Sequence, residues 1–122
     1  MNLEKNLISD VVNRQLVSMG IPVHFYGFLY LQYAITLAFE EPRVLLAVSK
    51  ELYPVIAARY GVSSYSVQGC IARAIKTAWE DETAEIRDRL KEFSGRSFSE
   101  RPTNAQFMKL TAMMVRNQVV KE

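Results

Sequence analysis

Apolar residues recur through most of the chain at the spacing of one face of an α-helix. Over residues 3–19 they stand three and four positions apart, which is typical of a helix that buries one side. This first pattern ends at Gly20 to Pro22, because glycine suits the end of a helix and proline cannot continue its hydrogen-bond ladder. The same signals predict further helices over residues 26–40, 43–60, 64–79, 82–93 and 104–120.

The apolar pattern does not decide where two of the predicted helices begin. Pro54 either begins a new helix or kinks the one predicted over residues 43–60. The last helix takes its N-cap from Thr103 or Asn104, after a polar loop. There is almost no alternation of apolar and polar side chains of the kind that predicts a strand. We therefore expect an all-α protein of about six helices, folded as a single domain over residues 1–122.

The segment from about residue 53 to residue 79 has the pattern of a helix-turn-helix, in which the second helix crosses the first steeply. Ala57 provides the small side chain that such a crossing needs, and Gly61 follows four residues later, where the turn favours positive φ. Ser63 or Ser64 would cap the second helix and leave its first amides free to bind a phosphate. Apolar side chains at interlocking positions would fill the space between the helices: Ile56, Tyr60, Val62, Val67 and Cys70.

Composition and charge narrow the range of functions. Hydrophobic residues make up 49% of the chain and charged residues 23%, as in a globular protein. No apolar run reaches the roughly 18 residues of a membrane span, and the N-terminus lacks a secretory signal. The single cysteine, Cys70, excludes an internal disulfide, so we expect a cytoplasmic protein.

The net charge is only +2, but it is unevenly distributed. Residues 43–79 carry five basic side chains against one acidic one, and residues 101–122 carry four against one. Two basic regions are typical of a modest nucleic-acid binder, although a solvated surface can have the same pattern.

Several blocks of sequence resemble a single family, and they occur in that family's order. They are MGIPVHFYG at 19–27, GFLYLQYAI at 27–35, KELYPVIAARYGVSS at 50–64, ARAIKTAW at 72–79 and RPTNAQFM at 101–108. The chain resembles, over nearly its whole length, the DNA-binding effector domain of the master sporulation response regulator of endospore-forming bacteria. This resemblance implies a six-helix fold in which the third and fourth helices form the helix-turn-helix.

The resemblance also implies partners and a mode of control. Members of the family bind short repeated promoter sites, commonly as a tandem dimer, and switch genes by their position relative to RNA polymerase. We accordingly expect double-stranded promoter DNA as the ligand, a homodimer on DNA, and RNA polymerase as a further partner. The family's regulator carries a phosphorylatable receiver domain ahead of the effector. Here only a short helix precedes the effector pattern, so we expect no receiver domain and no control by the chain's own phosphorylation.

The predicted recognition helix departs from the family. The family projects an arginine, a glutamate, a second arginine and, one turn on, a histidine toward DNA; in register, this sequence has Ser66, Gln68, Gly69 and Arg73. Arginine pairs bidentately with guanine, so the family's strongest guanine contacts are lost, whereas Gln68 suits adenine and Arg73 suits guanine or a phosphate. Gly69 either allows a close approach to DNA or marks a site no longer under selection, and the sequence leaves both interpretations open.

The candidate site residues follow from this register. Those expected to bind DNA are Ser63, Ser64, Tyr65, Ser66, Gln68, Gly69, Arg73 and Lys76. Those expected to hold phosphates are Arg59, Lys109 and Arg116.

Other chemically suggestive residues are more simply explained as structure. His24, the only histidine, stands beside aromatic residues and predicts a packing contact. The acidic side chains of residues 80–88 stand beside Arg87, Arg89 and Lys91, and Glu85 stands four residues before Arg89, so we expect a solvated helix face with that ion pair. In the family, this region contacts polymerase. Three methionines predict either core or a dimer interface: Met108, Met113 and Met114.

The sequence shows no glycine-rich phosphate loop, no spacing of metal ligands and no nucleophile–base pair. We therefore expect no enzyme, cofactor, metal or small-molecule substrate. Two functions remain. The first is a DNA-binding transcription regulator with altered base-contacting residues. The second is a degenerate effector domain that modulates the full-length regulator or RNA polymerase through protein contacts.

Overall fold

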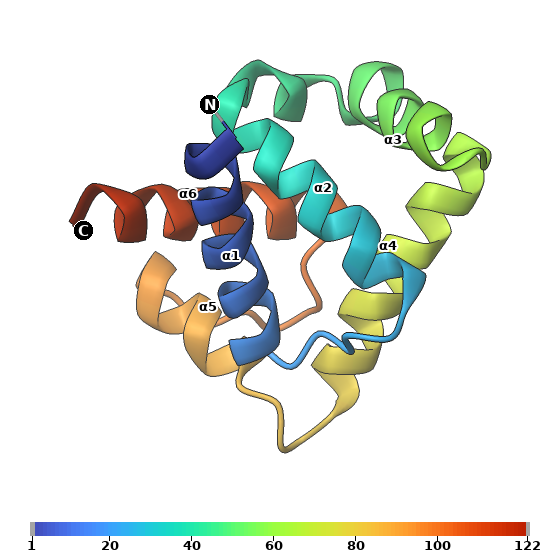
Figure 1. The fold of residues 1–122 in the computed structure, drawn as a ribbon. Coiled ribbons are helices and arrows are strands. Elements are labelled where there is room, and N and C mark those ends of the chain that lie inside the picture. The colour runs from blue at the N-terminus through green and yellow to red at the C-terminus, as the bar shows by residue number, and fades with distance from the viewer. Residues whose placement is uncertain (1, 122) are drawn as a thin grey trace.

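The structure, a computed structural model, describes residues 2–121 as a set of packed helices (Figure 1). The six α-helices are α1 (Asn2–Ser18), α2 (Tyr26–Glu40), α3 (Tyr53–Tyr60), α4 (Ser64–Glu80), α5 (Ile86–Ser94) and α6 (Asn104–Lys121). Two short irregular helices, η1 (Pro42–Leu46) and η2 (Val48–Leu52), join α2 to α3. No strand occurs within the described residues, and the prediction of an all-α fold of about six helices is confirmed.

Helix α2 lies at the centre and contacts α1, α4 and α6 (Figure 1). Its composition explains this position, since small and aliphatic side chains occupy several of its faces and Leu31, Ala34 and Ile35 are fully buried. Phe107 of α6 and Ile71 of α4 are also fully buried, and all of these belong to one hydrophobic core. Burial of this apolar surface is the main force that holds the helices together. Between residues 2 and 121, no helix combines the length and the hydropathy that crossing a membrane requires.

The single helix predicted over residues 43–60 is wrong in its first half. Residues 42–46 form a 3-10 helix and residues 48–52 a π-helical turn, separated by Ala47, whose φ of −143° and ψ of 57° are not helical. Helix α3 begins only at Tyr53, so Pro54 stands in its first turn. There a missing N–H costs no hydrogen bond, whereas deep within a longer helix it would. Of the two roles expected for Pro54, it begins a new helix.

The helix predicted over residues 82–93 starts later than expected, at Ile86. The carboxylate of Asp81 accepts hydrogen bonds from the backbone N–H and the hydroxyl of Thr83, at 2.9 and 2.7 Å. An Asx turn of this kind competes with helical hydrogen bonding and delays the helix. The same two hydrogen bonds lower the pKa of the Asp81 carboxyl below its ordinary value.

Arg89 does not make the expected ion pair with Glu85. Its guanidinium donates instead to the hydroxyl of Ser18 and, at 2.6 Å, to the side-chain carbonyl of Gln15, so it ties α5 to α1. Of the three methionines, Met108 and Met114 belong to the core, whereas Met113 is 48% exposed.

Candidate nucleic-acid interface

The turn between α3 and α4 has the geometry of a helix-turn-helix. Gly61 adopts φ 67° and ψ 35°, a left-handed conformation that glycine reaches without the steric cost of a Cβ atom. The N–H groups of Gly61 and Val62 both donate to the carbonyl of Ala57, the latter at 3.0 Å, which closes the end of α3. Ala57 and Ile56 are buried beneath the turn, as the apolar pattern predicts.

Ser63 is the residue that caps α4. Its backbone is extended, with φ −85° and ψ 156°, and its hydroxyl oxygen accepts the N–H of Ser66 at 3.0 Å. Ser64, the other serine considered for this role, is the first residue of the helix and is half-buried. The cap fixes where α4 begins and therefore which side chains face outward.

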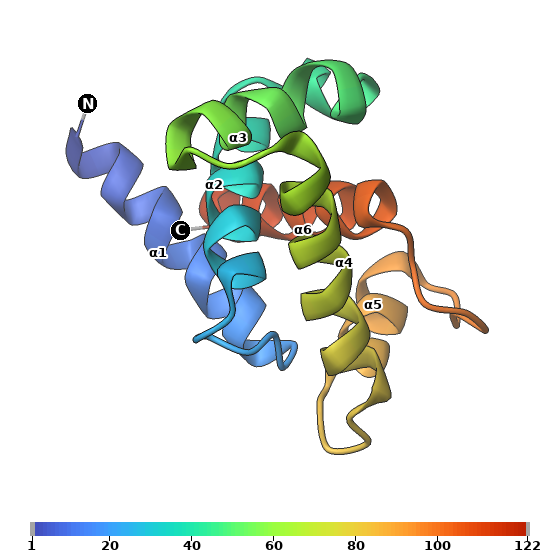
Figure 2. The same cartoon turned by 90° about the vertical axis from the view of Figure 1, so that its right-hand side faces the viewer.

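Helix α4 has one buried and one exposed side. The buried side consists of Val67, Ile71, Ala74, Ile75, Ala78 and Trp79. The exposed side carries Tyr65, Gln68, Gly69, Arg73 and Lys76, with Ser66 half-buried at its margin. Figure 2 shows α4 in front of α6. Five of the predicted DNA-binding residues thus lie on one accessible helix face, which we call the α4 face.

The back of α4 is held against α2 at very short range. A Cβ atom built on Gly27 would lie 2.2 Å from the carbonyl oxygen of Cys70 and 2.7 Å from the Cβ of Ala74. Any side chain at position 27 would therefore push the two helices apart. Cys70 itself is half-buried at this crossing, in keeping with its expected role as a small packing residue.

A second contact fixes α4 to the start of α6. The side-chain amide of Asn104 donates to the backbone carbonyl of Gln68 at 3.1 Å and to the hydroxyl of Tyr53 at 3.0 Å. Tyr53 is buried, and this burial raises the pKa of its phenol, which the hydrogen bond from Asn104 partly offsets. The phenol is therefore neutral at neutral pH, and one amide group joins α3, α4 and α6.

The N-cap of α6 explains why Asn104 is available for this contact. Thr103 accepts the N–H of Gln106 at 3.1 Å through its hydroxyl, and Gln106 accepts the N–H of Thr103 at 2.9 Å through its side chain. This reciprocal arrangement is a capping box. Because Thr103 is the cap, the side chain of Asn104 is left free to reach α4.

Gln68 and Arg73 lie on opposite flanks of the α4 face. Gln68 borders an open groove of about 520 Å³ between α4, η2 and the start of α6, together with Tyr65, Gly69 and Asn104. Arg73 borders a different hollow beside Gly27, where its guanidinium lies 5.6 Å from the ring of Phe25. Gly69 lies between the two flanks, and a Cβ atom there would meet nothing within 4 Å. No packing within the protein therefore requires a glycine at this position.

The predicted phosphate-binding residues fall into two groups. Arg59, at the end of α3, is exposed with its guanidinium 5.7 Å from the ring of Tyr33, and belongs to the helix-turn-helix. Lys109 and Arg116 lie on another side of the protein, where both line a pocket between η1 and α6. Arg116 donates to the carbonyl of Phe39 at 2.5 Å and stacks 4.4 Å from its ring. The structure thus brings Arg59 near the α4 face but not Lys109 or Arg116.

The remaining candidate, His24, is exposed and makes an edge contact with the ring of Phe25 at 5.1 Å. Sequence patterns missed Gly27 and Asn104, which position α4. A local signal for Asn104 does exist, since the spacing of Thr103 and Gln106 fits a capping box and implies that Asn104 has another task.

A comparison with known families agrees with this geometry. The sequence profile of the family described as sporulation initiation factor Spo0A C terminal matches residues 12–115 of the chain. The match includes all of α2 to α5, most of α6, and every candidate DNA-binding residue except Arg116.

Proposed function

Since the chain belongs to the Spo0A C-terminal domain family, whose members are DNA-binding transcription-factor domains and not enzymes, we propose that it regulates transcription by placing α4 in the major groove of promoter DNA. The observation that carries this proposal is the α4 face itself. It is exposed and polar, it has no packing partner at Gly69, and it stands on a helix anchored from behind by Gly27 and from one side by Asn104. A major groove about 12 Å wide admits such a helix.

The base contacts would come from the two flanks of the α4 face. The amide of Gln68 can donate to and accept from adenine, and the guanidinium of Arg73 can donate twice to guanine or contact a phosphate. Gly69 between them would allow the backbone of α4 to approach the base edges closely. Ser66 and Gly69 replace arginines of the family pattern, so the preferred site would differ from that of the family.

Residues other than those that contact bases would hold the DNA backbone. Arg59 and Lys76 are both exposed near the ends of the helices that form the turn, and they are the cations best placed for phosphates. Ser63 and Ser64 would present the first amides of α4 to a phosphate. We further propose that the protein acts in the cytoplasm as a homodimer on DNA in contact with RNA polymerase.

Selection of preferred sequences from a random pool of DNA duplexes tests this function. We expect enrichment of one short motif, and binding that weakens steeply with salt because phosphate contacts release counterions. A pool that remains unenriched after several rounds, with weak binding to all duplexes alike, would contradict a sequence-specific regulator.

One observation favours the second function, a modulator that acts through protein contacts. Only a single guanidinium, that of Arg73, remains on the α4 face to address guanine. On this alternative, Gln68→Ala together with Arg73→Ala would leave promoter regulation intact, and the purified domain would bind the full-length regulator or polymerase in the absence of DNA. If it binds neither, the alternative fails.

A further inference from the structure

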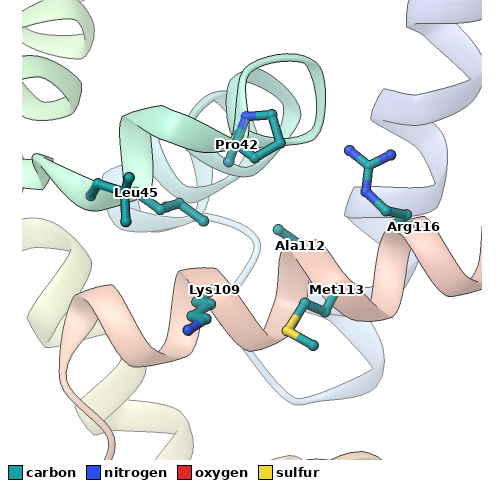
Figure 3. A pocket seen from close by; sticks show the side chains of 8 residues that line it. Pro42, Leu45, Lys109, Ala112, Met113 and Arg116 are labelled. Atoms are coloured by element: carbon teal, nitrogen blue, oxygen red, sulfur yellow. The ribbon is translucent and has the colours of Figure 1, made fainter.

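A groove of about 250 Å³ runs between η1 and α6, and none of its lining residues belongs to α3 or α4 (Figure 3). Pro42, Leu45 and Leu46 line it from η1. Lys109, Met113 and Arg116 line it from α6, where their spacing places them along one face of the helix. We call this feature the η1–α6 groove.

The η1–α6 groove exposes apolar side chains that the fold itself does not use. Leu46 is 89% exposed and Met113 is 48% exposed. Val120 stands two turns beyond Met113 on the same face of α6 and is 78% exposed, with Arg116 and Asn117 in the turn between them. Contiguous apolar surface bordered by charged side chains is typical of an interaction site, whereas isolated exposed apolar residues are not.

The charged side chains that line the η1–α6 groove are both basic. Lys109 and Arg116 stand before and after Met113, about 10 Å apart along α6, and no acidic side chain lines the groove. Arg116 is already held in place by the carbonyl and the ring of Phe39. A guanidinium fixed in this way loses little further side-chain entropy when it meets an anion. The groove therefore favours an occupant that is apolar on one side and negatively charged beside it.

The size of the groove favours apolar side chains of a helix over a small molecule. Small-molecule sites usually enclose about 300 to 1,000 Å³, and this groove is smaller and is formed by one turn of η1 against two turns of α6. A helix laid in such a groove inserts apolar residues from successive turns. We propose that the η1–α6 groove binds an acidic amphipathic helix of a partner protein.

Among the residues whose side chains the structure describes, neither α5 nor the exposed side of α1 offers a second copy of this chain a helix of that kind. Its acidic segment leads into α5, but Ile86 and Leu90, the apolar residues of that helix, are fully buried. The exposed strip of α1 contains Leu7 and Val17, with one acidic and one basic side chain between them at Asp10 and Arg14. Neither helix offers an apolar face flanked by acidic side chains alone. The occupant is therefore a different protein.

A synthetic helix provides the test. The probe is a fluorescein-labelled peptide of about 15 residues, long enough to form a helix on binding, with leucines along one face and glutamates on the others. We expect saturable binding in fluorescence anisotropy, with methyl NMR shifts at Met113 that exceed those at the buried Met108 and Met114. Met113→Glu should weaken binding about tenfold or more, as for a central interface residue. Val17→Glu, at a similarly exposed apolar position on α1, should leave binding unchanged.

Charge reversal tests the stated chemistry of the partner. The same peptide with lysine in place of every glutamate should bind the wild type weakly and should bind Lys109→Glu better than the acidic peptide does. Equal binding of both peptides, no binding of either, or binding that survives Met113→Glu would overturn the proposal. So would concentration-dependent self-association abolished by Met113→Glu, because the groove would then be a contact between copies. Met113→Glu changes none of the candidate DNA-binding residues and should bind the selected DNA motif as the wild type does, so failure here is separate from failure of the proposed function.

Discussion

Asn104 donates a hydrogen bond to the backbone carbonyl of Gln68 at 3.1 Å, and so the first residue of α6 holds the second turn of the predicted recognition helix. The two residues are 36 positions apart in the sequence. Asn104 itself is half-buried beside the α4 face, in the groove that Gln68 borders. The contact therefore couples the orientation of Gln68 to the packing of α6.

Removing this amide tests the coupling. Asn104→Ala loses the hydrogen bonds to Gln68 and Tyr53, and we expect the free energy of unfolding in urea to fall by about 1–2 kcal/mol. Affinity for the selected DNA motif should fall as well, because α4 would be less firmly oriented. Asn117→Ala, an exposed position on the same helix, is the matched control and should change neither quantity. Loss of stability with unchanged DNA binding would show that the contact serves folding alone.

Gly27 offers a test of how closely α4 must pack. Gly27→Ala places a methyl group against the carbonyl of Cys70, so the helices must shift, and we expect a loss of about 1–3 kcal/mol in the free energy of unfolding. Chemical denaturation measures this directly. A variant as stable as the wild type would mean that the crossing of α2 and α4 is looser than its geometry indicates.

The same substitution at Gly69 should have the opposite effect on stability. Gly69→Ala adds a methyl group where nothing lies within 4 Å, and alanine favours helix by about 1 kcal/mol. We expect a higher midpoint of unfolding together with weaker binding to the selected motif, because the methyl group would hold α4 away from the base edges. A more stable variant with undiminished binding would favour the other interpretation, a glycine at a site no longer under selection.

Salt dependence distinguishes the two groups of basic residues. Lys76→Ala should weaken binding and reduce the slope of log K against log salt by about 1, as expected for the loss of one phosphate contact. Lys109→Ala should leave the slope unchanged, because Lys109 lies in the η1–α6 groove. If Lys109→Ala reduced the slope as much as Lys76→Ala, this result would indicate that α6 contacts the DNA backbone.

The features of this structure that could be predicted are those determined by residues close together in the sequence. The left-handed Gly61 and the Ser63 cap depend on contacts at most five residues apart, and the buried positions of α4 follow the helical spacing of its apolar residues. The split at Ala47 was not predictable, because residues 43–60 have helical periodicity and nothing in the local pattern marks Ala47 as a break.

The contacts that position the candidate site could not be predicted, because they join residues that are far apart in the sequence. Gly27 meets Cys70, and Asn104 meets Gln68, only because α2, α4 and α6 pack together. Helical periodicity also showed that Lys109 and Arg116 are exposed, but the direction in which they face depends on the placement of α6 against η1. Family resemblance supplied the register of Ser66, Gln68, Gly69 and Arg73, which no local pattern could assign.

The most direct test of the account is the affinity of Gln68→Ala and Arg73→Ala, singly and together, for the selected DNA motif and for a scrambled duplex. Each single change should cost about 1–3 kcal/mol of discrimination against the scrambled duplex, and the double variant should bind both duplexes alike. Lys91→Ala, which removes a comparable charge from the exposed side of α5, should retain the preference. If the double variant still prefers the motif as strongly as the wild type, the α4 face does not recognise DNA sequence.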